Sequence, residues 1–345
     1  MSLYEEILSQ PEILKRSYEH NLENVKEIGK ALRGQEIHYA FMSARGTSDN
    51  AARYAKYLMG AYNQLPVALA APSLFSIYNQ APKMDGALII GISQSGQSPD
   101  IVNVLVDGKQ QGRPTLAITN APNSPLADAA DFVIDIAAGE EKAVAATKTY
   151  TTQLLAIAML SAAMAGDDER LEQLAKLPDW VASVLEQDVH IANLAPRYRY
   201  MSQCVVLGRG FNYATAFEWA LKMKELTYVI AEPYSSADFR HGPIAVVGDG
   251  FPVMAVAPSG GVYADMLDLL KKLVEGHQAE LLVISDQQEA LDLATSAIQL
   301  PVSMPEWVSP IVGIVPGQLF SYYLTAVKGY NTESPRGLNK VTMTK

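Results

Sequence analysis

The stretch that decides the fold is 87–105, "ALIIGISQSGQSPDIVNVL". Its apolar start at 87–93 predicts a buried strand, and Ser98 followed by Pro99 and Asp100 predicts the N-cap and first turn of a helix. The turn between them holds Ser93, Gln94, Ser95 and Gly96. A polar turn between a buried strand and a capped helix lies at the carboxyl end of the strand and at the positive end of the helix dipole.

Apolar runs of strand length recur on both sides of this stretch. They alternate with helical patterns, which predicts a parallel sheet covered by helices. The runs are "HYAFMS" (38–43), "TLAITN" (115–120) and "DFVIDI" (131–136) in the first half, and "QCVVLG" (203–208), "FPVMAVAP" (251–258), "AELLVISD" (279–286) and "AIQLPV" (297–302) in the second.

The two halves also share a longer pattern. Residues 38–59 and 203–224 both run from an apolar strand through an Arg-Gly turn into a helix that opens with small residues. The predicted fold is therefore α/β, with two doubly wound parallel-sheet domains in tandem, each a flavodoxin-like three-layer α/β/α unit. The polar helical region 166–201 joins them, and we place the boundary near residue 190. This predicts a first domain at 1–190, with an N-terminal helical segment, and a second at 191–345 with a C-terminal tail.

Composition restricts the possible partners. The chain has 345 residues, 49% of them hydrophobic, and a formal net charge of −10, with no basic run that would follow a nucleic acid or an anionic membrane. The apolar stretch 154–166 is too short to span a bilayer and predicts a buried helix. Cys204 is the sole cysteine, which excludes an internal disulfide and a cysteine-based metal cluster. We expect a cytoplasmic protein.

The serine-rich turn favours a phosphate. Backbone N–H groups and serine hydroxyls donate hydrogen bonds without adding charge, which suits a phosphate monoester in an acidic protein. An ordinary turn and helix cap is the alternative. Neither a Gly-Lys-Ser/Thr loop nor the G-x-G-x-x-G spacing is present, so a nucleotide is not expected.

A second group of polar residues lies on the helix predicted at 214–228. An apolar face carries Ala216, Trp219, Ala220, Met223 and Leu226, whereas Glu218, Lys222 and Glu225 share another face. Spacing alone favours an ordinary surface ion-pair ladder. The region 231–243, "AEPYSSADFRHGP", is predicted as a polar loop that carries His241, a candidate acid or base. Lys340 belongs to a tail that composition alone predicts to be frayed.

Seven blocks, in order, resemble the sugar isomerase (SIS) domain family, in particular the isomerase half of glucosamine-6-phosphate synthase. They are "RGTSDNA", "ISQSGQSPD", "AVAATKTYTTQL", "LGRG", "ALKMKELTY", "FRHGP" and "PRGLNK". The resemblance implies that Ser93, Gln94, Ser95 and Ser98, with Thr47 or Ser48, bind the phosphate of a hexose 6-phosphate. It implies that Glu225 moves a proton between C1 and C2, supported by Lys222. It also implies that His241 assists ring opening, from its own or a neighbouring subunit, and that Lys340 reaches the open-chain carbonyl. The sugar-site segment of the synthase, "VASTK", reads "VAATK" here, so Val144 and Ala146 take the places of its sugar contacts.

The resemblance extends to the stand-alone deaminases of the family and implies a homodimer with shared active sites, with no metal or other cofactor. The chain begins at what resembles the linker after the glutaminase of the synthase. We therefore expect the deaminase reaction, a hydrolysis of glucosamine 6-phosphate to fructose 6-phosphate and ammonia. The alternatives are a fructosamine-6-phosphate deglycase, a plain aldose–ketose isomerase, an isomerase subunit that works with a separate glutaminase, and a sugar-phosphate sensor.

Overall fold

The computed structural model describes residues 1–302 and 304–340, and the chain forms two compact units. The first unit contains residues 9–141, 148–178 and the tail residues 339 and 340. The second unit contains residues 1–8, 142–147 and 179–338. The domain boundary near residue 190 stays a prediction.

The first unit is built on a parallel sheet of five strands in the order β2-β1-β3-β4-β5. This is the flavodoxin-like order, in which the chain moves outward from β1 in one direction and then from β3 in the other. The strands are β1 (Tyr39–Ser43), β2 (Val67–Leu69), β3 (Ala87–Ser93), β4 (Thr115–Thr119) and β5 (Phe132–Asp135). The helices are α2 (Gln10–Arg33), α3 (Thr47–Asn63), α4 (Ser73–Ser76), α5 (Pro99–Gln110), α6 (Pro125–Ala129), α7 (Lys148–Ala165) and α8 (Asp168–Leu174).

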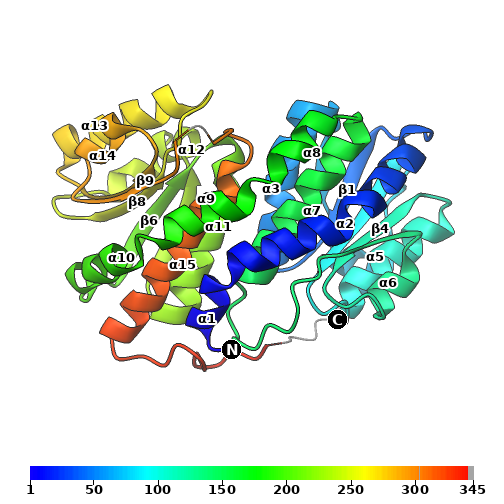
Figure 1. Ribbon diagram of the computed structural model, residues 1–345, viewed down its shortest axis with the longest axis horizontal. Coiled ribbons are helices and arrows are strands. Elements are labelled where there is room, and N and C mark those ends of the chain that lie inside the picture. The colour runs from blue at the N-terminus through cyan, green and yellow to red at the C-terminus, as the bar shows by residue number, and fades with distance from the viewer. Residues whose placement is uncertain (303, 341–345) are drawn as a thin grey trace. The chain divides into compact units, whose positions relative to one another are not determined.

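Helices cover both faces of this sheet (Figure 1). On one face, Phe75 of α4, Ile101 of α5 and Leu126 of α6 pack against Ile89 of β3. On the other face, α7 packs against α2 and α3. Residues 148–163 of α7 are all buried, which confirms the buried helix predicted around 154–166.

The second unit repeats the first. Its five parallel strands have the order β10-β9-β8-β6-β7, which is the same topology. The strands are β6 (Gln203–Gly208), β7 (Ile230–Ser235), β8 (Pro252–Val256), β9 (Glu280–Ser285) and β10 (Ser296–Gln299). The helices are α1 (Leu3–Leu8), α9 (Leu177–Leu185, which begins in the first unit), α10 (Asp188–Leu194), α11 (Tyr213–Lys222), α12 (Ser236–Arg240), α13 (Tyr263–His277), α14 (Gln288–Asp292) and α15 (Ser309–Val327). Short helical turns lie at η1 (Ala195–Tyr198), η2 (Gly210–Asn212), η3 (Met223–Thr227) and η4 (Pro243–Val246). The predicted fold class is confirmed.

The most apolar helix of the second unit is α15. It is long and apolar enough to cross a membrane by length and composition, but 78% of its most apolar window is buried within the protein. Its residues pack on α11, where Phe320 meets the ring of Trp219 edge-on at 6.1 Å. Burial on this scale is the mark of a core helix in a folded unit.

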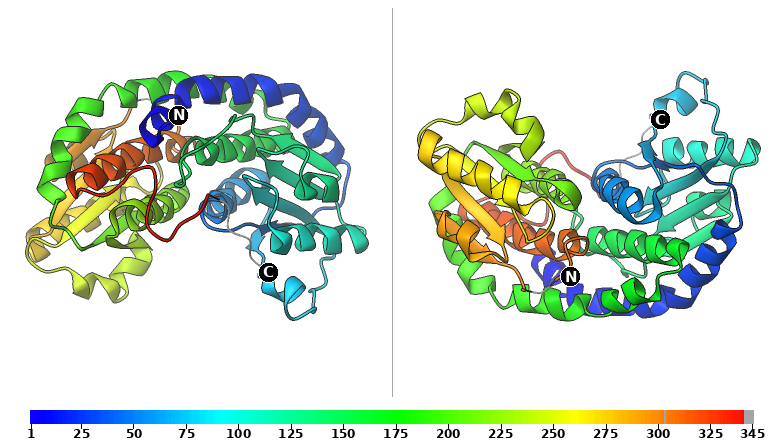
Figure 2. Two further views of the ribbon diagram at one scale, coloured as in Figure 1. Left: turned by 90° about the horizontal axis from the view of Figure 1, so that it is seen from below. Right: turned by 90° about the horizontal axis from the view of Figure 1, so that it is seen from above.

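The N-terminal helix α1 also belongs to the second unit. Figure 2 shows it beside α15. Tyr4 stacks on Tyr322 with ring centroids 5.2 Å apart, and the Leu3 N–H donates to Glu333 at 2.9 Å. Leu3 and Ile7 are fully buried.

The prediction of a loop at 231–243 was wrong in part. Residues Ile230–Ser235 form the edge strand β7, which pairs with β6, and Ser236–Arg240 form the short helix α12. Pro233 is tolerated because an edge strand leaves one side of its backbone without a neighbour. The Ser235 hydroxyl caps α12 by accepting from the Asp238 N–H at 3.1 Å.

Candidate functional site

The serine-rich turn lies at the point of the first sheet where the strand order reverses. Strands β1 and β3 are neighbours, with Ser43 level with Gly91, and the chain leaves them in opposite directions. Ligands of doubly wound proteins bind in the crevice at this point, outside the carboxyl ends of the strands. The turn after β3 and the Arg-Gly turn after β1 therefore lie at the same edge of the first sheet.

The conformation of the serine-rich turn depends on a glycine and on a hydrogen bond within the turn. Gly96 has φ +63°, and a Cβ there would lie 2.0 Å from the Ser124 hydroxyl oxygen, so only glycine fits without rearrangement. The Gly96 N–H donates to the Ser93 hydroxyl at 3.1 Å. Ser98 occupies the predicted N-cap of α5, yet its hydroxyl makes no capping hydrogen bond to that helix. Gln94, Ser95 and Ser98 are all partly exposed, so a ligand can reach this turn.

An ion pair joins the two turns. Arg45 Nε donates to Asp100 Oδ2 at 2.9 Å, and the Asp100 side chain is fully buried in the first turn of α5. Ser48, in the first turn of α3, is buried and accepts at Oγ from Gln153 Nε2 of α7 at 3.1 Å. Thr47 begins the same helix and is partly exposed. The structure therefore brings the predicted phosphate residues Thr47, Ser48 and 93–98 to one edge of one sheet.

Lys340 is also in the first unit. Its Nζ donates to Glu141 Oε2 at 2.6 Å. The tail is thus anchored at this lysine, and the frayed end expected from composition alone is wrong for residue 340. Val144 and Ala146, by contrast, belong to the second unit, and both are partly exposed.

The predicted proton carrier Glu225 and its supporting residue Lys222 lie in the second unit and form a cluster with Glu218. Lys222 Nζ lies 2.5 Å from Glu225 Oε2 and 3.4 Å from Glu218 Oε1. The side chains of Glu218 and Lys222 are 0% and 1% exposed, whereas Glu225 is 23% exposed. The surface ladder favoured by spacing alone is therefore wrong, because α15 packs over α11.

Glu225 lies on a π-helical turn. Helix α11 ends at Lys222, and residues Met223–Thr227 form one wider turn that closes at Tyr228 in the left-handed conformation, φ 58°. Such turns are rare and concentrate at functional sites. Tyr228 also holds the tail, because its hydroxyl accepts from the Arg336 N–H at 2.9 Å and its ring lies 4.0 Å from the Arg336 guanidinium carbon.

His241 lies at the end of α12 and is exposed. Its backbone N–H donates to Asp238 O at 3.1 Å, and its ring makes no hydrogen bond or ion pair with the residues that the structure describes. The neighbouring Arg240 pairs with Asp268 at 2.8 Å. Within the second unit, the structure does not bring His241 into contact with Glu225.

The corresponding edge of the second sheet carries its own acidic groups. Arg209, after β6, pairs with Asp265 at 2.7 Å, as Arg45 pairs with Asp100 in the first unit. After β8, however, the Gly261 N–H donates to Glu306 Oε2 at 2.7 Å, and the Ser259 N–H donates to Asp286 at 2.6 Å. Carboxylates therefore occupy backbone donors of this loop.

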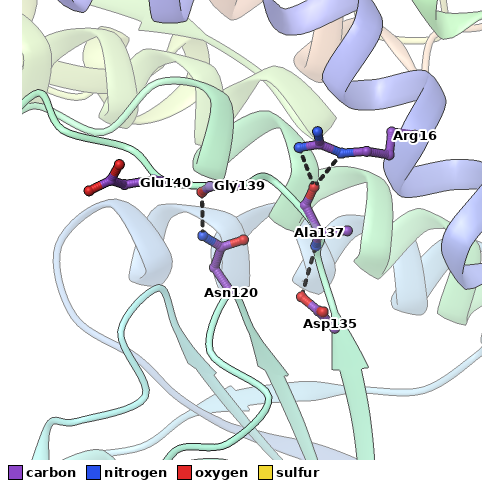
Figure 3. Close-up of a pocket in the computed structure, with 6 residues that line it drawn as sticks. All are labelled: Arg16, Asn120, Asp135, Ala137, Gly139 and Glu140. Atoms are coloured by element: carbon purple, nitrogen blue, oxygen red, sulfur yellow. Dashed lines mark hydrogen bonds between the residues drawn. The ribbon is translucent and has the colours of Figure 1, made fainter. Parts of the chain in front are cut away.

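Figure 3 shows a pocket of about 430 Å³ in the first unit. Its lining residues are Arg16, Asn120, Asp135, Ala137, Gly139 and Glu140, none of which was predicted. Arg16 donates twice to Ala137 O, and Asn120 donates to Gly139 O at 2.8 Å. The Asn120 backbone N–H donates to Gln94 O at 3.2 Å, which connects the pocket to the serine-rich turn.

Two further observations concern cofactors and nucleophiles. Among residues 1–302 and 304–340, no group of three or more His, Cys, Asp or Glu side chains is arranged to hold a metal ion. Burial raises the pKa of the Cys204 thiol to about 12, so this cysteine is not a thiolate at neutral pH.

The fold is a tandem of two doubly wound units, with a polar serine-rich turn at the point where the strand order of the first sheet reverses. The SIS domain family model matches residues 36–163 and 200–328, one match in each half, and the chain belongs to this family.

The chain is similar to named relatives over nearly all of its own length. It is 32% identical over 343 residues to the glutamine–fructose-6-phosphate aminotransferase (isomerizing) of Pyrococcus horikoshii, covering 98% of this chain but only 57% of that protein. The C-terminal domain of a glucosamine-fructose-6-phosphate aminotransferase from Francisella tularensis has a TM-score of 0.87 and 28% identity, covering 96% of this chain and 98% of that one. A candidate phosphosugar isomerase from Silicibacter pomeroyi has a TM-score of 0.85 and 32% identity, covering 96% and 99%. These names support the prediction of an enzyme.

Sequence reasoning missed Glu141, the partner of Lys340. Glu140 and Glu141 are adjacent glutamates before a helix, and they carry no local signal that one of them is buried. Glu218 was placed on the correct face of its helix, and its burial became evident only from the packing.

Proposed function

We propose that this protein is a phosphosugar aldose–ketose isomerase that converts glucosamine 6-phosphate and water into fructose 6-phosphate and ammonia. The observation that carries the proposal is the Glu225 carboxylate, partly exposed on a π-helical turn and held by a buried lysine. A 1,2-proton shift needs one such group that can take and return a proton.

The serine-rich turn supplies the substrate-binding part of the proposal. Its partly exposed hydroxyls and backbone donors suit the phosphate at C6. The charge of Arg45 is neutralised by Asp100, so the turn offers uncharged hydrogen-bond donors to the phosphate. Binding through the phosphate would hold the sugar while its other end reacts.

In the proposed reaction, His241 moves a proton from O1 to the ring oxygen, which opens the ring to the C1 aldehyde. Glu225 then takes the proton from C2 and returns it to C1. The C1=O double bond becomes a single bond and O1 gains a proton, while the C2 amine loses one N–H proton, so the aldehyde becomes a hydroxymethyl group and the amine becomes an imine. Water adds to C2, and ammonia leaves. Lys340 contacts O1 while charge develops there.

The proposed direction needs water as its only second reactant, whereas the reverse reaction needs a source of ammonia. Cys204 is not a candidate for releasing ammonia from glutamine, because burial raises the pKa of its thiol to about 12.

Synthesis with a separate glutaminase is the second candidate. It is favoured by the names of the relatives, which are glutamine-dependent aminotransferases at 32–36% identity. A partner that supplies ammonia would allow the same proton shift to run from fructose 6-phosphate.

A coupled assay tests the proposal. The purified protein is incubated with glucosamine 6-phosphate without glutamine, and fructose 6-phosphate and ammonia are measured together, with Glu225→Gln as the control. Equal amounts of both products support the deaminase. Product only from fructose 6-phosphate with ammonium supports the second candidate, and turnover of fructosamine 6-phosphate alone indicates a deglycase. If no sugar phosphate is converted but one binds, the protein is a sensor.

A homodimer with shared sites also remains a proposal. The exposed position of His241 supports it, since a ring at the end of α12 is accessible to a second copy. Sedimentation of an active monomer would exclude it. A cytoplasmic location stays a prediction.

A further inference from the structure

Glu141 is held in place by hydrogen bonds and anchors the Lys340 side chain. Its side chain is fully buried and accepts hydrogen bonds from two residues of the first unit. Lys340 Nζ donates to Oε2 at 2.6 Å, the Thr149 hydroxyl donates to the same oxygen at 2.8 Å, and the Thr149 N–H donates to Oε1 at 3.1 Å. Both carboxylate oxygens are thereby fixed.

Helix α7 connects Glu141 to Ser48, one of the predicted phosphate residues. Thr149 and Gln153 are four residues apart on this helix, so their side chains are neighbours on one face. Gln153 Nε2 donates to Ser48 Oγ at 3.1 Å. The first two turns of α7 therefore donate hydrogen bonds both to Glu141, the partner of Lys340, and to Ser48, a candidate phosphate residue.

We propose that Glu141 is a positioning residue for Lys340. A lysine side chain is flexible, and its ammonium is a point charge with no preferred plane, so a fixed acceptor is needed to place it. The buried carboxylate provides that acceptor, and the N-terminus of α7 together with the ammonium compensates its charge. This inference rests on the proposed function, in which Lys340 contacts the open-chain sugar.

Kinetics of two variants test the positioning role. Glu141→Gln removes the charge and keeps the shape, and kcat should fall on the order of tenfold to a hundredfold, with KM for the sugar phosphate nearly unchanged. Thr149→Val, which removes one hydroxyl donor to the carboxylate, should lower kcat by a smaller factor. Thr149→Ser restores the hydroxyl and should restore kcat. A fall in kcat that serine does not rescue would contradict the role of this hydrogen bond.

A second measurement does not depend on turnover. Brief acetylation followed by mass spectrometry reports how accessible the Lys340 amine is, with Lys271, which pairs with Glu289 in the second unit, as the internal control. Lys340 should be labelled several times faster in Glu141→Gln than in the wild type, and Lys271 at the same rate in both.

The two measurements separate the possible failures. Unchanged Lys340 labelling overturns the anchor whatever the activity. Faster labelling with unchanged kcat also overturns the positioning role, because a displaced lysine then does not matter for turnover. If the wild type converts no sugar phosphate, the proposed function fails, and the labelling alone decides whether Glu141 holds Lys340.

Discussion

Replacing Lys222 by methionine should destabilise the protein strongly. Methionine has nearly the same length and keeps the packing, but it removes the ammonium that lies 2.5 Å from Glu225 and 3.4 Å from Glu218. Glu218 is 0% exposed, so water cannot replace that ammonium. Removing one partner of a buried ion pair costs about 3–5 kcal/mol, a large part of a total stability of roughly 5–15 kcal/mol.

Urea unfolding followed by far-ultraviolet circular dichroism measures this loss. With an m-value near the upper end of about 1–3 kcal/mol/M, the midpoint should fall by about 1–2 M. The double variant Glu218→Gln with Lys222→Met removes both buried charges, and it should recover at least about 2 kcal/mol of the loss. Glu225 does not have to be replaced as well, because its side chain is 23% exposed and water can solvate its charge.

The reasoning is refuted if Lys222→Met costs less than about 1 kcal/mol. That value is typical of an exposed pair, and it would mean that these residues form the surface ladder which spacing alone suggests. Failure of the double variant to recover stability would instead assign the loss to packing and not to charge.

Three further predictions concern single residues. Glu225→Gln should lower kcat by about 10²–10⁴-fold, because the proton carrier is lost, whereas calorimetric binding of the sugar phosphate and the activity of the exposed control Glu232→Gln should stay near wild type. Gly96→Ala should lower the free energy of unfolding in urea by about 1–3 kcal/mol and weaken phosphate binding, since an alanine there combines φ +63° with a clash against Ser124. The control Gly112→Ala, at φ +70° with nothing within 4 Å, should show only the smaller cost of backbone strain and leave phosphate binding intact. Because burial raises the pKa of the Cys204 thiol to about 12, iodoacetamide at pH 8 should leave the native protein unmodified and alkylate it in urea; rapid alkylation of the native protein would show that the β6 core opens readily.

The central strands could be predicted from the sequence because parallel strands buried on both faces read as apolar runs. Each of the eight predicted runs overlaps a strand of the structure. The two missed strands, β2 and β7, lie at sheet edges. β2 has only three residues, and β7 includes Glu232 and Pro233, so neither has the composition of a buried strand.

The site was predictable where local order alone determines it. A turn after β3 and a helix that begins directly after Ser98 follow from neighbouring residues, and both are found, although the Ser98 hydroxyl makes no capping hydrogen bond. The burial of Glu218 and Lys222 depends on α15, which is almost a hundred residues away and contains Pro316, a residue that usually interrupts a helical pattern. The Lys340–Glu141 pair joins positions 199 apart, a distance over which sequence periodicity carries no information.

The contact between α1 and α15 has a consequence for biosynthesis. About 300 residues separate these helices, so at roughly 5–20 residues per second the ribosome needs ~15–60 s to deliver the partner of α1. During that interval the apolar side chains of Leu3 and Ile7 have no core to enter. We expect the second unit to be completed only after α15 has left the ribosome, with α1 as one of its last pieces to dock.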